Sequence, residues 1–216
     1  MNILRWAALG LLLACNDAPE DAMASSDLIE ETETEAEAEA ESATGCPARM
    51  VQLPTGTCMD RHEAQVDEGR AVSAEGRLPS NGLSFNDAAS ACTAAGFRLC
   101  TRDEWNAACG ADDYPYGTDY EQDRCNSAAN GTDVRTRALA PSGSSEGCVS
   151  PLGVHDLSGN VLEWIDAADA TGSLRELRGG SFASYPARAK CEYEHNLFQP
   201  PDAAFDGQGF RCCTGG

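Results

Sequence analysis

The stretch 147–164 holds the side chains whose types and spacing could most directly do chemistry. Oxygen-bearing side chains stand at Asp156, Asn160 and Glu163, with Gly159 among them. Carboxylates spaced along a glycine-containing loop suit a hard cation such as calcium, which collects roughly six to eight oxygens from side chains and backbone carbonyls. The alternative is an ordinary turn in which Asp156 and Asn160 bond their own backbone.

The composition argues against several classes of partner. The chain has 216 residues, 11 cysteines and a formal net charge of -20. Nucleic acids and anionic membrane surfaces are bound by clusters of lysine and arginine, so this acidity disfavours both. The many cysteines indicate an oxidising compartment. Because none of them forms a C-x-x-C pair, neither a zinc ribbon nor a thioredoxin motif is expected.

The first 15 residues are typical of a bacterial lipoprotein signal peptide. A short basic start is followed by an apolar run at 6–14 that is too short to span a bilayer. The run ends L-L-A-C, which resembles a lipobox, so Cys15 is expected to carry lipid and to anchor the chain in the bacterial cell envelope. Asn16 favours the outer membrane, with the chain facing the periplasm. The alternative is an ordinary cleaved signal that leaves Cys15 as a spare thiol.

Residues 16–45 are expected to be a disordered acidic tether without chemistry of its own. The glutamate-rich repeat has too little apolar surface to offset the entropy of ordering, and its like charges extend it. A helix is conceivable for the Glu-Ala repeat, but repulsion between stacked glutamates opposes it. The folded domain is therefore expected at 46–216.

Two helices are predicted within this domain. Ser84 is the expected N-cap of the first, and Gly96 ends it. Thr101 and Glu104 form a capping box for the second, which Gly110 ends. The rest of the domain reads as short strands and long loops with a small core. Disulfides at about 2–4 kcal/mol each would compensate for that small core.

Five motifs of this domain resemble those of one known family. Segment 96–105, G-F-R-L-C-T-R-D-E-W, resembles the G-x-R-L-P-T-E-x-E-W signature of the formylglycine-generating enzymes, also called sulfatase-modifying factors. Four more follow in the family's order: Y-P-Y-G at 114–117, G-V-H-D-L-S-G-N-V-L-E-W at 153–164, R-G-G-S-F at 178–182 and G-F-R-C at 209–212. The resemblance implies an α+β fold of the C-type-lectin-like kind, with few helices, short strands, long loops and several disulfides.

The resemblance also implies cysteine pairs that the sequence alone would leave open. Family members pair a cysteine of the first helix with the one in G-F-R-C, and the cysteine ending the second helix with one that follows R-G-G-S. Two further pairs flank short segments, and the last two cysteines are left for each other. The expected set is Cys92–Cys212, Cys109–Cys191, Cys125–Cys148, Cys46–Cys58 and Cys100–Cys213. Neighbours 212 and 213 can serve different partners because successive strand residues face opposite sides.

Structural calcium is a further implication of the resemblance. The family binds an ion through the loop that matches 156–163. The corresponding ligands are the side chains of Asp156 and Glu163 and the carbonyls of Gly159 and Val161. A second family site would match the side chains of Asn126 and Asp133 and the carbonyls of Ser127 and Arg135, on a looser alignment.

The family's enzymatic chemistry requires a cysteine pair that this chain does not have. Those enzymes oxidise a cysteine of a sulfatase with oxygen and copper(I), which two thiolates hold after R-G-G-S. Here Ser184 stands at the first position, and Pro186 or Ala189 at the second. Ser181 matches an active-site serine of the family but alone would bind no metal. Copper-dependent formylglycine generation is therefore not expected.

Other enzymatic readings have less support. Related sulfoxide synthases use three histidines, but His62, His155 and His195 lie in separate segments of this chain. Ser181 or Ser184 with His195 and an acid would formally make a hydrolase triad, yet no G-x-S-x-G elbow accompanies them.

Two hypotheses remain. The first is a membrane-anchored, non-catalytic binding or scaffolding lipoprotein whose ligand is an unidentified protein, peptide or glycan. The alternative is an oxidoreductase-type relative of the formylglycine-generating enzymes with altered active-site chemistry. Fold membership alone does not decide between them.

Overall fold

The structure is a computed structural model that describes residues 45–192 and 197–215. The predicted signal peptide, all but the last residue of the predicted tether, and His195 lie outside the described residues.

Both predicted helices are present, and local capping explains where each begins. Helix α1 (Phe85–Ala94) starts where the Ser84 side chain accepts a hydrogen bond from the Asp87 amide. Helix α2 (Arg102–Cys109) starts at a reciprocal capping box between Thr101 and Glu104. These bonds satisfy amides at the start of each helix that have no partner within it.

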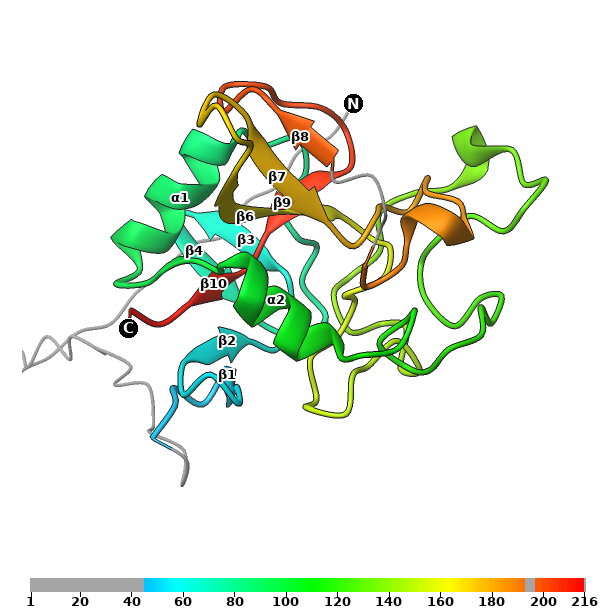
Figure 1. The fold of residues 1–216 in the computed structure, drawn as a ribbon, viewed down its shortest axis with the longest axis horizontal. Coiled ribbons are helices and arrows are strands. Elements are labelled where there is room, and N and C mark those ends of the chain that lie inside the picture. Colours follow the sequence, from blue (N-terminus) through cyan, green and yellow to red (C-terminus); the bar gives the residue numbers. More distant parts are fainter. Residues whose placement is uncertain (1–44, 193–196, 216) are drawn as a thin grey trace, which may run out of the picture. The chain divides into compact units, whose positions relative to one another are not determined.

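The strands form three small sheets (Figure 1). The first has the order β1–β2–β10–β5, and its neighbouring strands are antiparallel: β1 Met50–Gln52, β2 Cys58–Asp60, β10 Cys212–Cys213 and β5 Arg98–Leu99. The second is the hairpin of β3 (Ala64–Asp67) with β4 (Arg70–Ser73). This arrangement brings the C-terminal strand between strands from the start of the domain.

The third sheet has the order β8–β7–β6–β9. Its strands are β8 Leu197–Gln199, β7 Arg175–Arg178, β6 Leu162–Ala168 and β9 Gln208–Phe210. Strand β9 runs parallel to β6, whereas the other pairs are antiparallel. Residues 162–164, at the end of the stretch 147–164, thus belong to β6, an inner strand of this sheet.

Much of the chain between α2 and β6 is irregular. In Figure 1 this segment, coloured green to yellow, lies to one side of the sheets. A single 3-10 turn, η1 (Val134–Thr136), interrupts it, and a second, η2 (Pro186–Arg188), follows β7. The predicted combination of few helices, short strands and long ordered loops is confirmed.

Three buried clusters form the core of the described residues, and β6 contributes to the two larger ones. Ile165 packs with Trp105 and Leu157 in one cluster. Trp164 packs with Phe210 in the other. Successive residues of a strand face opposite sides, so one strand links the two halves of the core.

Five disulfides staple the described part of the chain, and they are the five pairs expected from the sequence. Cys212 belongs to one core cluster and Cys213 to the other, which agrees with the expectation that they face opposite sides of a strand. Three of the bridges connect residues 82 or more positions apart, Cys92–Cys212, Cys100–Cys213 and Cys109–Cys191. Closing such long loops constrains the unfolded chain the most.

Candidate functional site

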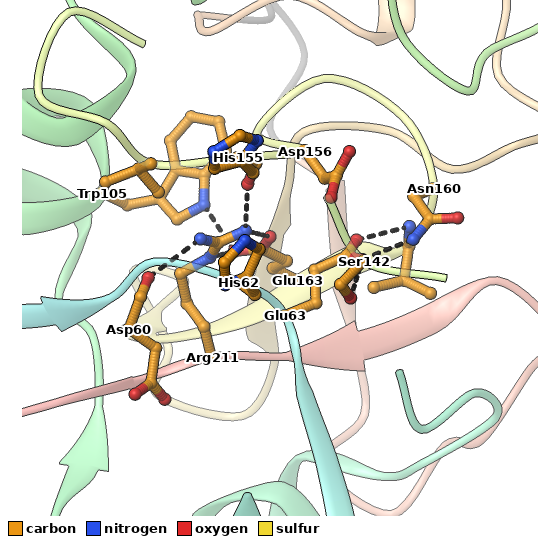
Figure 2. Close-up of polar contacts among 12 residues, drawn as sticks. Asp60, His62, Glu63, Trp105, Ser142, His155, Asp156, Asn160, Glu163 and Arg211 are labelled. Carbon is orange, nitrogen blue, oxygen red and sulfur yellow. Dashed lines mark hydrogen bonds and ion pairs between the residues drawn. The ribbon is translucent and has the colours of Figure 1, made fainter. Parts of the chain in front are cut away.

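Arg211 and Glu163 form a buried ion pair (Figure 2). Arg211, which is 1% exposed, donates from Nη2 to Oε1 of Glu163 at 2.6 Å and from Nε to Oε2 at 2.8 Å. The indole of Trp105 donates to the same Oε2 at 2.9 Å. The carboxylate of Glu163 therefore accepts three hydrogen bonds. Two of these bonds come from the buried guanidinium of Arg211.

The remaining donors of Arg211 bind backbone carbonyls. The guanidinium donates to the carbonyls of Asp60 at 3.1 Å, Arg61 at 3.3 Å and His155 at 2.8 Å. Since an unpaired charge is very unfavourable in a protein interior, these contacts fix the positions of the segments that supply them.

Glu63 is a second buried carboxylate beside this pair. It accepts hydrogen bonds from the Ser142 hydroxyl and the Val161 amide, each at 3.0 Å, and also from the Asn160 side chain. Burial, followed by the charges of Asp156 and Glu163, raises the pKa of Glu63 well above its usual range.

Asp156 is the third carboxylate of the cluster. Its Oδ2 accepts a hydrogen bond from the Gly143 amide at 2.6 Å. Burial raises the pKa of Asp156 to about 6, against the lowering effects of the Gly143 amide and Arg211, and the charge of Glu163 adds to the increase. We call Glu63, Asp156, Glu163 and Arg211 the central cluster. When all four are ionised, three carboxylates face one guanidinium.

The loop that leads into β6 has unusual backbone angles and a close backbone contact next to the central cluster. Asp156 and Asn160 both have positive φ, 60° and 54°. A Cβ on Gly159 would overlap the carbonyl of Asn126. The Asn160 side chain also accepts from the Asn126 side chain at 2.9 Å and from the Ala140 amide at 3.0 Å. The side chains of Asn160 and Asp156 thus bond to other segments of the chain, whereas the turn alternative had them bond their own backbone.

The first expected calcium set has the donor types that calcium selects, but its oxygens already have partners. Both carboxylate oxygens of Glu163 accept hydrogen bonds from Arg211, one of them also from Trp105, and Oδ2 of Asp156 accepts from the Gly143 amide. Gly159 and Val161 lie on the same loop. Among the residues that the structure describes, no group of three or more His, Cys, Asp or Glu side chains could hold a metal. The expected set has two such side chains, so an ion here would depend on carbonyls and water for its other ligands.

The second expected set, Asn126, Ser127, Asp133 and Arg135, does not fit calcium. Both carboxylate oxygens of Asp133 accept from the Arg135 guanidinium, at 2.9 and 2.7 Å. The amide oxygen of Asn126 accepts from Arg137 at 3.0 Å. Two guanidinium groups therefore already serve the oxygens that a cation would need, and they leave this loop without excess negative charge.

The positions that match the family's catalytic pair form a tight, self-bonded turn. Ser184 Oγ accepts from the Ser181 amide at 2.9 Å, and Ser181 Oγ accepts from the Ala183 amide at 3.3 Å. A Cβ on Gly180 would lie 3.0 Å from Cβ of Ser184 and 3.1 Å from Cα of Ala189, so these two positions pack around the same glycine. The other candidate for the second position, Pro186, begins η2.

Two histidines from distant segments meet next to the central cluster. The rings of His62 and His155 stack with their centroids 4.9 Å apart and an angle of 22° between their planes. Burial is the largest cause that lowers the pKa of each, to about 4 for His62. In the sequence they lie in separate segments, and nothing in their spacing indicates this contact.

A pocket of about 380 Å³ lies at the end of α2. Its walls come from 109–112, from Y-P-Y-G at 114–117, from Arg124 and from 149–151. Tyr114 stacks on Tyr116 with centroids 5.4 Å apart, and the Arg124 guanidinium lies 5.1 Å from the centre of the Tyr116 ring. The volume is within the usual range of ligand pockets.

Comparison with known proteins gives one family and one fold. The model of the sulfatase-modifying factor enzyme 1-like domain matches residues 26–215. "Inactive C-alpha-formylglycine-generating enzyme 2" of Bos taurus is 32% identical over an alignment of 171 residues, and the match covers 68% of this chain and 54% of that protein. Its Mus musculus counterpart is 30% identical over an alignment of 161 residues, and that match covers 68% of this chain and 52% of that protein. The chain therefore spans about half the length of these curated relatives.

Solved structures show the same fold at low identity. PvdO from Pseudomonas aeruginosa superposes with a TM-score of 0.56 at 17% identity, over 73% of this chain and 79% of its own. CarF gives 0.55 at 19%, over 73% and 85%. These neighbours have formylglycine-generating-enzyme and C-type-lectin-like folds, so the expected fold class is confirmed.

Replacing Glu163 with glutamine tests the central ion pair. The variant should lose about 3–5 kcal/mol of unfolding free energy, because Arg211 would stay buried without its counter-charge. Denaturant unfolding with the disulfides intact measures this loss. The control Glu121→Gln breaks an exposed 2.9 Å pair with Arg124 and should lose less than about 1 kcal/mol. Equal losses in the two variants would show that the buried pair has no special role.

Proposed function

The chain belongs to the family of sulfatase-modifying factor enzyme 1-like domains, and from this membership we propose that it is a non-catalytic binding or scaffolding member anchored to a membrane. Two of the curated relatives that it resembles carry the word inactive in their names. That similarity supports a role in which the domain has kept the fold without the family's oxidation chemistry.

The observation that carries this proposal is the state of the cysteines. All ten cysteines of the described residues are in disulfides. The eleventh, Cys15, lies outside the described residues. Copper(I) selects soft thiolate ligands, and a disulfide sulfur is not a thiolate. The hydroxyl of Ser184 and the methyl of Ala189 offer no substitute.

The pocket at the end of α2 is the surface that we assign to ligand binding. Its walls have little freedom to move, since Cys109 is bridged to Cys191 and the Tyr114 hydroxyl donates to the Pro186 carbonyl at 3.1 Å. A pre-formed site limits the entropy lost on binding. Its tyrosines and guanidinium suit polar groups of a protein, peptide or glycan, the ligand classes considered from the sequence.

Lipid on Cys15 would anchor the chain in the envelope of a bacterium, with the folded domain in the periplasm. Within the described residues no helix is long and apolar enough to cross a membrane. In this proposal the lipobox-like sequence provides the attachment, and the acidic segment after it would serve as the spacer.

We also assign a structural calcium ion to Asp156, Glu163 and the carbonyls of Gly159 and Val161. The gathering of three carboxyl groups near one guanidinium supports this assignment, because a divalent cation would favour their ionised forms; Glu163 would exchange a hydrogen bond from Arg211 or Trp105 for the ion. The ion would stabilise the fold and would take no part in a reaction.

Copper(I) titration of the purified chain tests the loss of oxidase chemistry. We expect no tight binding against a chromophoric copper(I) chelator, and no oxygen consumption with a C-x-P-x-R peptide. The double variant Ser184→Cys/Ala189→Cys is the matched control, and its copper(I) binding should exceed that of the unmodified chain. Tight copper(I) binding with peptide turnover by the unmodified chain would end the non-catalytic proposal.

Replacing Cys15 with serine tests the anchor. In a bacterial host, the unmodified chain should incorporate labelled fatty acid and sediment with membranes, whereas Cys15→Ser should do neither. The tether variant Ser25→Ala should behave like the unmodified chain. If Cys15→Ser still sediments with membranes, the lipid anchor is refuted.

Thermal unfolding with calcium or with EDTA tests the calcium assignment. Calcium at about a hundredfold excess over its Kd should add about 2.7 kcal/mol to the unfolding free energy. Asp156→Asn should unfold at a higher temperature than the unmodified chain in EDTA at neutral pH, because it removes a buried charge, and should lose the response to calcium. Asp133→Asn should keep that response. A melting temperature that is the same in calcium and EDTA would contradict the assignment.

A further inference from the structure

The described part of the chain contains two Asn-Gly dipeptides, Asn81–Gly82 and Asn130–Gly131. Both asparagine side chains are exposed, and the two glycines have similar positive φ angles, 75° and 84°. The two sites therefore have the same sequence, similar exposure and similar glycine backbone angles. They differ in the hydrogen bonds of the asparagine side chain and of the glycine amide.

At Asn81 these groups are all held by hydrogen bonds. The side-chain nitrogen Nδ2 donates to Oδ1 of Asp206, and the side-chain oxygen Oδ1 accepts from the Gly207 amide, each at 2.5 Å. The Gly82 amide donates to the Gln208 carbonyl at 2.8 Å. Any reaction between the Gly82 nitrogen and the Asn81 side chain would first have to break these bonds.

At Asn130 the corresponding groups are free. Within 45–192 and 197–215, no residue forms a hydrogen bond with the Asn130 side chain or with the Gly131 amide. The Thr132 amide donates to the Ala129 carbonyl at 3.1 Å, so Asn130 and Gly131 are the two central residues of a β-turn. A Cβ on Gly131 would meet no atom within 4 Å. The turn therefore leaves open space beside the Gly131 nitrogen.

Both sides of this turn are tied to the segment that follows β7. The Ala128 amide donates to the Ser184 carbonyl at 2.9 Å, and the Tyr185 hydroxyl donates to the Thr132 carbonyl at 3.2 Å. Figure 1 shows this part of the chain in light green, next to the orange η2. The turn lies between the two anchors, so a change in the length of its backbone acts on both.

We propose that Asn130 is a site of spontaneous deamidation, in which the Gly131 amide nitrogen attacks Cγ of the Asn130 side chain. The Gly131 nitrogen forms a bond to Cγ and gives up its proton. The bond from Cγ to Nδ2 breaks, and Nδ2 takes up a proton and leaves as ammonia. Glycine favours this attack, because it has no Cβ to crowd the nitrogen.

Water then opens the resulting succinimide ring. Addition of water at Cγ yields aspartate, whereas addition at the backbone carbonyl carbon of Asn130 yields isoaspartate. The whole conversion consumes one water and releases one ammonia, and nothing is oxidised or reduced. The reaction therefore needs no cofactor and no second protein.

The products change the charge and the length of the loop. Either product replaces a neutral amide with a carboxylate. Isoaspartate also adds one methylene to the main chain, which separates the Thr132 amide from the Ala129 carbonyl. The Tyr185 hydroxyl then loses its fixed partner at Thr132, so the contact between this loop and the turn at 181–185 loosens.

Incubation of the folded full chain in mildly alkaline buffer, then rapid digestion at low pH and peptide mass spectrometry, tests this site. The peptide that contains Asn130 should show the mass increase of NH2 replaced by OH, and an isoaspartyl methyltransferase should label it. Asn81 should react on the order of a hundredfold more slowly, because three hydrogen bonds must open first. Asp206→Ala removes the partner of Nδ2 and should speed the reaction at Asn81 about fivefold, without change at Asn130.

The reduced and denatured chain is the control. It lacks the hydrogen bonds of the fold and should react at similar rates at Asn81 and Asn130, whereas Asn130→Gln should remove the isoaspartate label at this position. Equal rates at the two asparagines in the folded chain would overturn the proposal. So would an Asn130 that stays unmodified in the folded chain over a time in which it reacts in the denatured chain.

Discussion

Arg211 donates five hydrogen bonds to groups that come from three separate parts of the chain. Two go to Glu163 on β6, two to the carbonyls of Asp60 and Arg61 next to β2, and one to the carbonyl of His155 in the long loop. The guanidinium is inaccessible to water, so any movement that breaks these bonds leaves a buried charge uncompensated. The positions of the strands and of the loop into β6 therefore depend on one another through this side chain.

Hydrogen bonds to the central cluster also hold the irregular segment between α2 and β6 in place. Asn160 connects Glu63, Asn126 and Ala140, which belong to segments with little regular structure. The Cys125–Cys148 bridge closes the same region from the other side. Side-chain hydrogen bonds and disulfides can thus order long loops in a protein with little regular secondary structure, because buried polar groups must keep their partners.

This arrangement is compatible with our proposal that the fold persists here without the oxidation chemistry of the family. The turn at Ser181 and Ser184 lies after β7 and forms its own hydrogen bonds. None of the contacts of Arg211 or Glu163 described above involves this turn. Loss of a thiolate pair there would remove copper ligands and leave these contacts in place, so function and fold could separate at this point.

The sequence predicted the features that depend on local or recognisable patterns. The caps at Ser84 and Thr101 are local chemistry, and the disulfide pairs followed from motif resemblance. Arg211 was detectable only as part of G-F-R-C, although an arginine between Phe210 and Cys212, in an apolar segment, already implies a buried partner. Glu63 and the contact between His62 and His155 were missed, because both depend on tertiary packing between segments that no spacing rule connects.

We propose that the domain keeps this disulfide-linked fold and has no thiol left for copper. Alkylation of the denatured, unreduced chain, followed by peptide mass spectrometry, measures the free thiols directly. We expect that no cysteine between positions 46 and 213 is alkylated until the disulfides are reduced. Alkylation of two of these cysteines before reduction would show a thiol pair that could bind copper, and would refute the proposal.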